Sequence, residues 1–444
     1  MFSHRRLHEV RIPLLIGKIK ALLANEGAMF FISNLVYSFS TYLIALLIPY
    51  KLNIETMAGF SAAFNIIMML IFVFEFGLTV SYLRFNQIYK ISDQINALIQ
   101  LMIFALLFVL SQTMLGHYAD IFFGVQNLGI AQSYIYLSIF ALLSWIFFKT
   151  TLLAKKRVKF IIVNSFIILA VRVVFLLYIL FWAKEIDLDM IYLYLFIIPF
   201  AMVIFLNMKY NIGFLAACKT QIAKKEIRDL FKRRMKQFIL FSALTYIING
   251  LYIYTNRYAI IYLVDEKMTT VLAELGYAMS FGGLILIFIS SLRSYFLSKF
   301  NMSQMDAVMA HIEGLKRYRP YVLGGGIVVS ALIAVVVNFI KPAYLSVDSP
   351  IYVFILIFAS IVIAYLSLFS LLSKTFNFNM LELKLNIIRL VLVIVLVHAL
   401  FKHYPIVAFA LINLAIVGVE YYFAKTVLKR IYEKEKSGEK IESA

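Results

Sequence analysis

Twelve long apolar stretches follow one another along the chain and make up most of its 444 residues. A helix of about 20 apolar residues crosses ~30 Å of hydrocarbon at 1.5 Å per residue. With 63% hydrophobic and 15% charged residues, the chain carries more apolar surface than a water-soluble fold can bury. We therefore predict an all-α polytopic membrane protein with about twelve transmembrane helices. The predicted spans are 29–50, 57–80, 97–116, 133–153, 160–183, 190–213, 237–262, 273–296, 320–342, 350–373, 384–401 and 404–428.

Lysine and arginine are distributed unevenly over the segments between these spans. Alternate segments, beginning with the N-terminal arm, carry 29 of these residues, whereas the intervening segments carry 5. The positive-inside rule produces this alternation only when the number and phase of the helices are right. We predict that both termini are cytoplasmic. The net charge of +19 then reflects topology and lipid headgroup contacts, and nucleic-acid binding is not needed to explain it.

A basic segment separates six predicted helices from another six, which predicts two lobes in parallel orientation. A shift of 209 residues supports this symmetry, because it aligns Ser81–Arg84 with Ser290–Arg293 and Tyr37 with Tyr246. The predicted parts are a cytoplasmic amphipathic arm (1–28), an N-terminal six-helix lobe (29–213), a basic cytoplasmic linker (214–236), a C-terminal six-helix lobe (237–428) and a cytoplasmic tail (429–444).

Two of the predicted helices carry polar side chains at helical spacing, which costs free energy in lipid. These stripes are Ser242, Thr245, Tyr246, Asn249, Tyr252 and Asn256 in one helix, and Ser33, Asn34, Tyr37, Ser38 and Thr41 in the other. They suit a water-filled path or a sugar ligand, and interhelical hydrogen bonding is the alternative. We favour a cavity lining, because two equivalent helices share the feature. The candidate substrate-binding residues are Asn34, Tyr37, Tyr246, Asn249 and Asn256.

Arg172 lies near the middle of the predicted span 160–183. An unpaired cation at this depth would cost roughly 2.5–3.5 kcal/mol. We interpret Arg172 as an anion site that faces a cavity, because a guanidinium can bind phosphate through two parallel hydrogen bonds. A buried ion pair with Glu75 is the alternative.

Other charged residues are candidates near helix ends or on neighbouring helices. Three arginines could meet an anionic headgroup, although membrane anchoring explains them as well: Arg84, Arg257 and Arg293. Arg389 and Glu420 lie at similar predicted depths on adjacent antiparallel helices, which indicates a structural ion pair. Glu75, Glu420 and Arg389 are therefore the candidates for ion pairing or for coupling to an ion gradient.

Residues 74–87 close the second predicted helix with Phe-Glu-Phe-Gly-Leu-Thr-Val-Ser-Tyr-Leu-Arg-Phe-Asn-Gln. This segment resembles one in O-antigen and other polysaccharide flippases, where an acidic residue, an aromatic residue and Gly-Leu precede a basic residue. Those proteins belong to the multidrug/oligosaccharidyl-lipid/polysaccharide exporter superfamily. The two six-helix lobes, the basic central loop and the internal termini resemble that superfamily too.

The resemblance implies a MATE-like fold with two bundles around a central, alternately open cavity. The implied cargo is an undecaprenyl-diphosphate-linked oligosaccharide that moves from the cytoplasmic to the outer leaflet of the bacterial inner membrane. A polysaccharide polymerase and chain-length machinery would be partners. Such transport makes no covalent bond, so we expect no enzyme activity, cofactor or metal.

Three other function classes compete with this interpretation. A multidrug exporter of the same fold would need a carboxylate in its cavity, for which Glu75 and Glu420 are candidates. A polysaccharide polymerase would carry a larger outer loop than the longest predicted one, at 117–132. A symporter with inverted repeats would not have parallel halves. The chain has no GxxxxGK[ST] motif, which argues against direct ATP hydrolysis.

Overall fold

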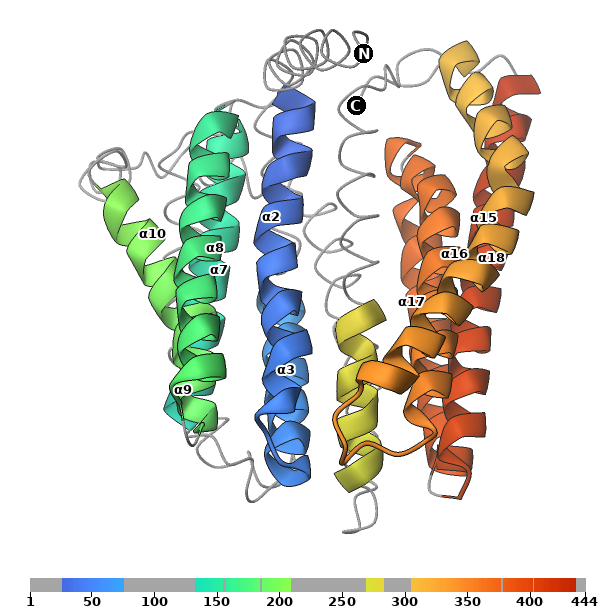
Figure 1. Ribbon diagram of the computed structural model, residues 1–444. Helices are drawn as coiled ribbons and strands as arrows, with labels where there is room; N and C mark the ends of the chain where they lie inside the picture. Colours follow the sequence, from blue (N-terminus) through green and yellow to red (C-terminus); the bar gives the residue numbers. More distant parts are fainter. Residues whose placement is uncertain are drawn as a thin grey trace, which may run out of the picture.

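The computed structural model describes most of both predicted lobes, and these residues form helices joined by short turns (Figure 1). The described residues are 26–75, 132–154, 157–183, 186–208, 269–282, 305–376, 378–401 and 403–436. Of the twelve predicted spans, 97–116 and 237–262 lie outside these residues. The other ten overlap described helices at least in part.

The helices form an N-terminal and a C-terminal group. The first group consists of α2 (Glu26–Leu47) with the 3-10 turn η1 (Ile48–Tyr50), α3 (Ile54–Glu75), α7 (Gln132–Ala154), α8 (Val158–Phe181), α9 (Leu188–Tyr192), the π-helix η3 (Leu193–Ile197) and α10 (Ile198–Met208). The second group consists of a helix over 269–282, α15 (Met305–Ile340), α16 (Ser349–Thr375), α17 (Asn379–Leu396) with the π-helix η6 (Val397–Phe401), and α18 (Pro405–Lys436). Pro405 begins α18, as the predicted break near 402–405 requires.

Within the described residues, eight helical segments are long and apolar enough to cross a membrane. In hydrocarbon, a helix satisfies its own backbone hydrogen bonds, so an apolar segment of this length is stable there. Large apolar side chains point outward from both groups; Phe205 is 75% exposed and Phe339 is 81% exposed. Lipid is the solvent that suits such a surface. The chain is therefore an all-helical, multi-pass membrane protein.

Helix α15 is longer than the sequence predicts. The predicted span begins at Pro320, but the helix runs over 36 residues from Met305 to Ile340 and contains that proline. Lys316, predicted in a loop, therefore lies on a helix, and its Nζ donates to the Tyr432 hydroxyl of α18 at 2.7 Å. The helix continues through this exposed turn although Pro320 supplies no backbone N–H, and the Tyr365 hydroxyl of α16 donates to the Leu315 carbonyl just before it at 2.9 Å.

The two groups stand beside each other as separate lobes (Figure 1). Helix α2 begins and α18 ends at the same end of the molecule, which we call the terminal end. The loops after η1 and after α15 lie at the opposite end, which we call the far end. Helix α2 packs against α8 in the N-terminal lobe, and α16 packs against both α15 and α18 in the C-terminal lobe.

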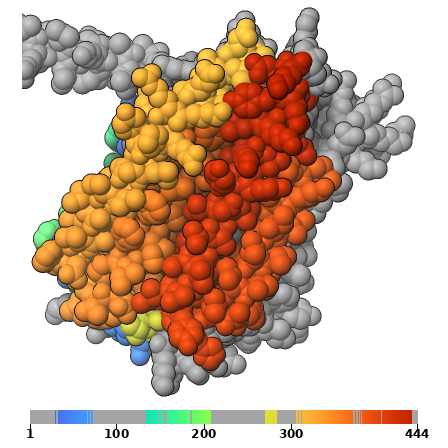
Figure 2. All heavy atoms as spheres, turned by 90° about the vertical axis from the view of Figure 1, so that its right-hand side faces the viewer, coloured from blue at the N-terminus to red at the C-terminus, as the bar shows by residue number. Residues whose placement is uncertain are grey.

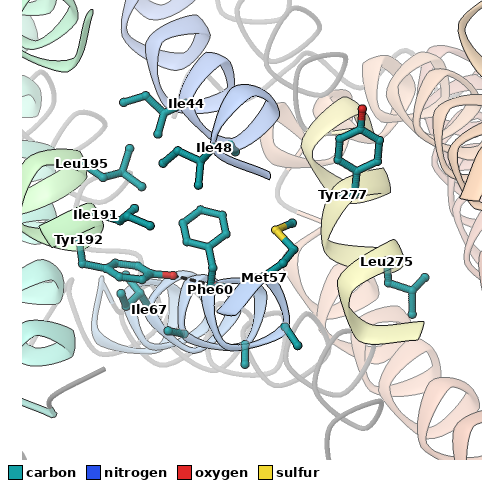
Figure 3. Close-up of a cluster of buried hydrophobic side chains, with 14 of the residues drawn as sticks. Ile44, Ile48, Met57, Phe60, Ile67, Ile191, Tyr192, Leu195, Leu275 and Tyr277 are labelled. Carbon is teal, nitrogen blue, oxygen red and sulfur yellow. Dashed lines mark hydrogen bonds between the residues drawn. The ribbon is translucent and has the colours of Figure 1, made fainter. Parts of the chain in front are cut away.

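The buried side chains form two clusters with different roles. One cluster joins the lobes near the far end, where Met57 of α3 lies next to the 269–282 helix and Ile48 and Phe60 face Ile191 and Leu195 (Figure 3). The other cluster belongs to the C-terminal lobe alone and packs α15 and α16 against α17 and α18. Shared apolar burial therefore holds the lobes together at the far end.

Candidate functional site

The polar stripe of α2 faces neighbouring helices of its own lobe. Ser33 Oγ lies 2.8 Å from Ser165 Oγ of α8, and both serines are fully buried. Thr41 Oγ1 accepts a hydrogen bond from Arg172 at 2.7 Å. Ser33 and Thr41 therefore fit interhelical hydrogen bonding, the alternative to a cavity lining, and a cavity lining stays a prediction for the rest of the stripe. Polar groups inside a membrane bundle are stabilised when they pair across helices.

Arg172 of α8 is the centre of this network and has no exposed surface. Its Nη1 donates to Ser40 Oγ and to Thr41 Oγ1, each at 2.7 Å, and to the Tyr37 carbonyl at 3.3 Å. Its Nε and Nη2 donate to the Leu195 carbonyl at 2.9 and 2.7 Å. The guanidinium thus ties α8 to α2 and to η3.

The sequence explains why the Leu195 carbonyl is available to Arg172. In an α-helix this oxygen would accept from the backbone N–H four residues later, but that residue is Pro199, which has none. Leu195 lies in the π-helix η3, a feature that often marks functional sites. Arg172 Nε and Nη2 both donate to this oxygen. A proline inside a predicted span, with an arginine in the preceding span, is the signal that could have predicted this contact.

Aromatic rings enclose the Arg172 guanidinium. Its Cζ lies 5.4 Å from the ring centres of both Tyr37 and Phe200, and Trp145 stacks on Phe200 at 6.1 Å. Ring faces attract a cation, most strongly where water is excluded. The expectation that Arg172 faces a cavity and binds an anion does not hold in this structure, because its donors meet protein acceptors. Among the described side chains, no carboxylate pairs with it.

Lys149 of α7, which lies near the end of the predicted span 133–153, is a further candidate site residue. It is half-buried, and its Nζ donates to Asn34 Oδ1 of α2 and lies 5.8 Å from the centre of the Tyr37 ring. The cluster of Lys149, Asn34 and Tyr37, which we call the α2–α7 cluster, lies nearer the terminal end than Arg172. It combines a cation, an amide and a tyrosine.

In the C-terminal lobe, Arg389 and Glu420 form the predicted ion pair. Arg389 Nη2 lies 2.5 Å from Glu420 Oε1, and both side chains are 10% exposed. Arg389 Nη1 also donates to Asn386 Oδ1 at 2.9 Å. This pair joins α17 to α18, as expected for antiparallel neighbours with charges at equal depth.

At the far end, tyrosines close the boundary between the lobes. Tyr344 donates to the Pro49 carbonyl at 2.9 Å, and the Tyr50 hydroxyl lies 3.4 Å from that of Tyr277 and donates to the Ile340 carbonyl. We call Tyr50, Tyr277 and Tyr344 the far-end seal. Burial raises the pKa of Tyr344 above its ordinary value, so the tyrosine stays a neutral donor.

Next to the far-end seal, the 269–282 helix packs closely against α3. A Cβ at Gly276 would lie 1.7 Å from Ser61 Oγ, so only glycine allows the 269–282 helix to approach α3 this closely. A cavity of about 20 Å³ lies beside this contact, lined by Tyr42, Asn65 and Ser280 among others. That volume holds about one water molecule. Among the described residues, the two lobes are therefore in close contact at this point.

The remaining candidate residues fall mostly outside the described part of the chain. These are Arg84, Arg257, Arg293, Tyr246, Asn249 and Asn256. Glu75 is the last residue of α3, and its side chain also lies outside the described part. Their roles stay predictions from the sequence.

These features define a class: a multi-pass helical membrane protein of two lobes that meet and seal at one end. Comparison with solved structures identifies the fold. The chain is similar to an inward-facing multidrug resistance MATE family transporter of the MOP superfamily (12% identity, TM-score 0.58, covering 94% of this chain and 96% of that one). An outward-facing structure described in the same words matches at 14% identity and TM-score 0.55, covering 93% and 96%.

A crystal structure of a MATE protein in complex with MaL6 also matches, at 13% identity and TM-score 0.57 over 93% of this chain and 98% of that one. No family model matches the chain, and no curated relative does. The fold is therefore MATE-like, as the sequence predicts.

Proposed function

We propose that this chain is a flippase that moves an undecaprenyl-diphosphate-linked oligosaccharide from the cytoplasmic to the outer leaflet by alternating access. One observation carries the proposal. The carboxylates buried within the described helices, Glu274 and Glu420, are held by the Ser346 backbone N–H and by Arg389, whereas the N-terminal lobe holds the cations Arg172 and Lys149. An interior of this kind suits an anionic cargo better than a cationic one.

The far-end seal supports a direction of access. With the lobes sealed at the far end, cargo enters from the terminal end, which the charge alternation predicts to be cytoplasmic. A diphosphate sugar needs a cation for its phosphates and hydrogen-bonding groups for its hydroxyls. The α2–α7 cluster supplies both near that entrance. Arg172 lies deeper and positions α2 by fixing its hydroxyls and backbone.

A multidrug exporter of the same fold is the second candidate, because the similar solved structures are described as multidrug resistance transporters. Such an exporter would use a carboxylate to attract organic cations. Glu420 is engaged with Arg389, which leaves Glu75 as the candidate that the sequence provides. The two functions therefore differ in the sign of the charge that meets the cargo.

Deletion of the gene in its own host tests the proposal directly. We expect the lipid-linked oligosaccharide to accumulate in the cytoplasmic leaflet, with susceptibility to cationic drugs unchanged. Accumulation in the outer leaflet without polymerisation would indicate a polymerase. Increased drug susceptibility with normal glycan would indicate the exporter.

A single substitution tests the α2–α7 cluster. Lys149→Gln keeps a donor for Asn34 but removes the charge, and we expect translocation to fall roughly tenfold or more, because a charged hydrogen bond to phosphate is lost. Lys149→Arg should retain most of the activity. Lys384→Gln, at an exposed lysine of α17, is the control and should leave translocation unchanged. Equal activity of the Lys149→Gln and control variants would remove Lys149 from the site.

A further inference from the structure

A large groove lies in the C-terminal lobe, apart from the sites above. Its volume is about 940 Å³, and α15, α16 and α18 line it. Because α16 packs against both α15 and α18, it forms the floor, and the other two helices form the walls. Apolar side chains line it, among them the buried Leu366 and Phe369 of α16 and the exposed Leu414 of α18.

The charges of the groove gather towards the terminal end of its walls. The basic lining residues are Lys316, Arg319, Lys425, Lys429 and Lys436, and one carboxylate, Glu433, accompanies them. Lys429 and Glu433 are 3.9 Å apart and largely exposed, so this ion pair offsets little of the positive charge. The groove is thus basic at one end and apolar at the other.

Two tyrosines of α18 hold the cations of α15 at the rim. Lys316 Nζ donates to the Tyr432 hydroxyl at 2.7 Å and lies 4.9 Å from the ring centre. Arg319 lies 5.9 Å from the centre of the Tyr421 ring. These contacts keep positive charge beside the groove while the side chains remain exposed.

The groove opens on the face of the C-terminal lobe that points away from the N-terminal lobe, where α15 and α18 run along the surface (Figure 2). In a multi-pass membrane protein this face meets the bilayer. Cargo that passes between the lobes would not cross it. A molecule that occupies the groove therefore comes from the lipids of the surrounding leaflet.

We propose that this groove binds one anionic glycerophospholipid of the leaflet at the terminal end. The phosphate lies among the lysines and Arg319, and an acyl chain lies on the apolar floor. Basic pockets between membrane helices recognise anionic headgroups by this combination of charge and apolar surface. The proposal holds whichever cargo the protein carries, because the groove lies outside the path between the lobes.

Gly418 allows the groove to be filled without disturbing the protein. It lines the groove on α18, and a Cβ built there would meet no atom within 4 Å. Gly418→Leu therefore places a side chain where the acyl chain would lie and leaves every charge intact. Gly324 of α15 has equally open surroundings but does not line the groove, so Gly324→Leu is the matched control.

The test is native mass spectrometry of the full chain with added phosphatidylglycerol or chain-matched phosphatidylethanolamine. We expect one phosphatidylglycerol to be retained in preference, and salt to weaken its binding. Lys425→Gln with Lys429→Gln should weaken it roughly 25-fold, about fivefold for each lysine. Arg317→Gln with Lys384→Gln, two exposed cations outside the groove, should leave it unchanged.

Gly418→Leu should also abolish the preference, whereas Gly324→Leu should retain it, with equal thermal stability of the two variants. Equal retention of both phospholipids would overturn the proposal, and so would equal binding by the groove and control variants. A polyprenyl diphosphate that displaces phosphatidylglycerol at a much lower concentration would overturn it as well, because the groove would then belong to the cargo.

Discussion

Each lobe buries an arginine in the interior of an apolar helix, and the two arginines are stabilised in different ways. Arg389 of the C-terminal lobe meets the carboxylate of Glu420 at 2.5 Å. Arg172 of the N-terminal lobe meets a carbonyl that Pro199 leaves without its helical donor, two hydroxyls and two aromatic rings. Neither arrangement leaves the guanidinium without acceptors.

The two arrangements give the lobes a different net charge at the buried arginine. The Arg389–Glu420 pair joins two helices and adds no net charge to the C-terminal lobe. Arg172 has only neutral partners among the described residues, so its positive charge persists inside the N-terminal lobe. Buried pairs cost desolvation of two ions, whereas Arg172 spreads one delocalised charge over many neutral acceptors. One lobe is thus neutral at its buried arginine and the other is cationic.

The largest expected effect is that of Arg172→Ala. The change removes five hydrogen bonds and opens a cavity, so we expect a loss of about 3–5 kcal/mol in stability. Thermal unfolding of the purified protein and its abundance in the membrane measure this. Arg172→Lys should recover part of the loss, since lysine keeps the charge but lacks the planar set of N–H donors of a guanidinium. An Arg172→Ala variant as stable as the unaltered chain would show that the contacts of Arg172 do not stabilise the N-terminal lobe.

A smaller loss of stability is expected in the C-terminal lobe, and a second substitution should restore most of it. Glu420→Gln leaves Arg389 as a buried cation without its counter-ion, which should cost about 2–3 kcal/mol. Adding Arg389→Leu removes that cation, and stability should return to within about 1 kcal/mol of the original. A double-mutant cycle on unfolding midpoints measures the coupling. Strictly additive effects would show that the pair does not act as a unit.

The smallest effect is expected where two hydroxyls pair with each other. Ser33→Ala alone should cost about 1 kcal/mol, because Ser165 loses its partner across the helix contact. Ser33→Ala with Ser165→Ala should be nearly neutral, since both polar groups are gone and only small side chains change. The same unfolding measurement separates the two cases. A double variant less stable than either single one would indicate that this contact is tightly coupled to the Arg172 network.

Much of the fold and part of the site followed from local sequence. Apolar length and the alternation of basic residues predicted the membrane class and ten of the observed helical stretches. The Arg389–Glu420 pair was predicted because equal depth on adjacent antiparallel helices brings opposite charges together. The start of α15 was predicted too late, because Pro320 suggested a boundary, whereas the helix continues through this proline.

The sequence by itself determined that this chain spans a membrane many times, since no other solvent accepts so many apolar residues. Only the tertiary structure decided which way the polar stripe of α2 and the guanidinium of Arg172 face. A helix fixes the spacing of its side chains, whereas their partners depend on which helix packs against that face. The far-end seal and the basic groove have the same origin, because each is made by residues that are distant in sequence and meet only in the folded chain.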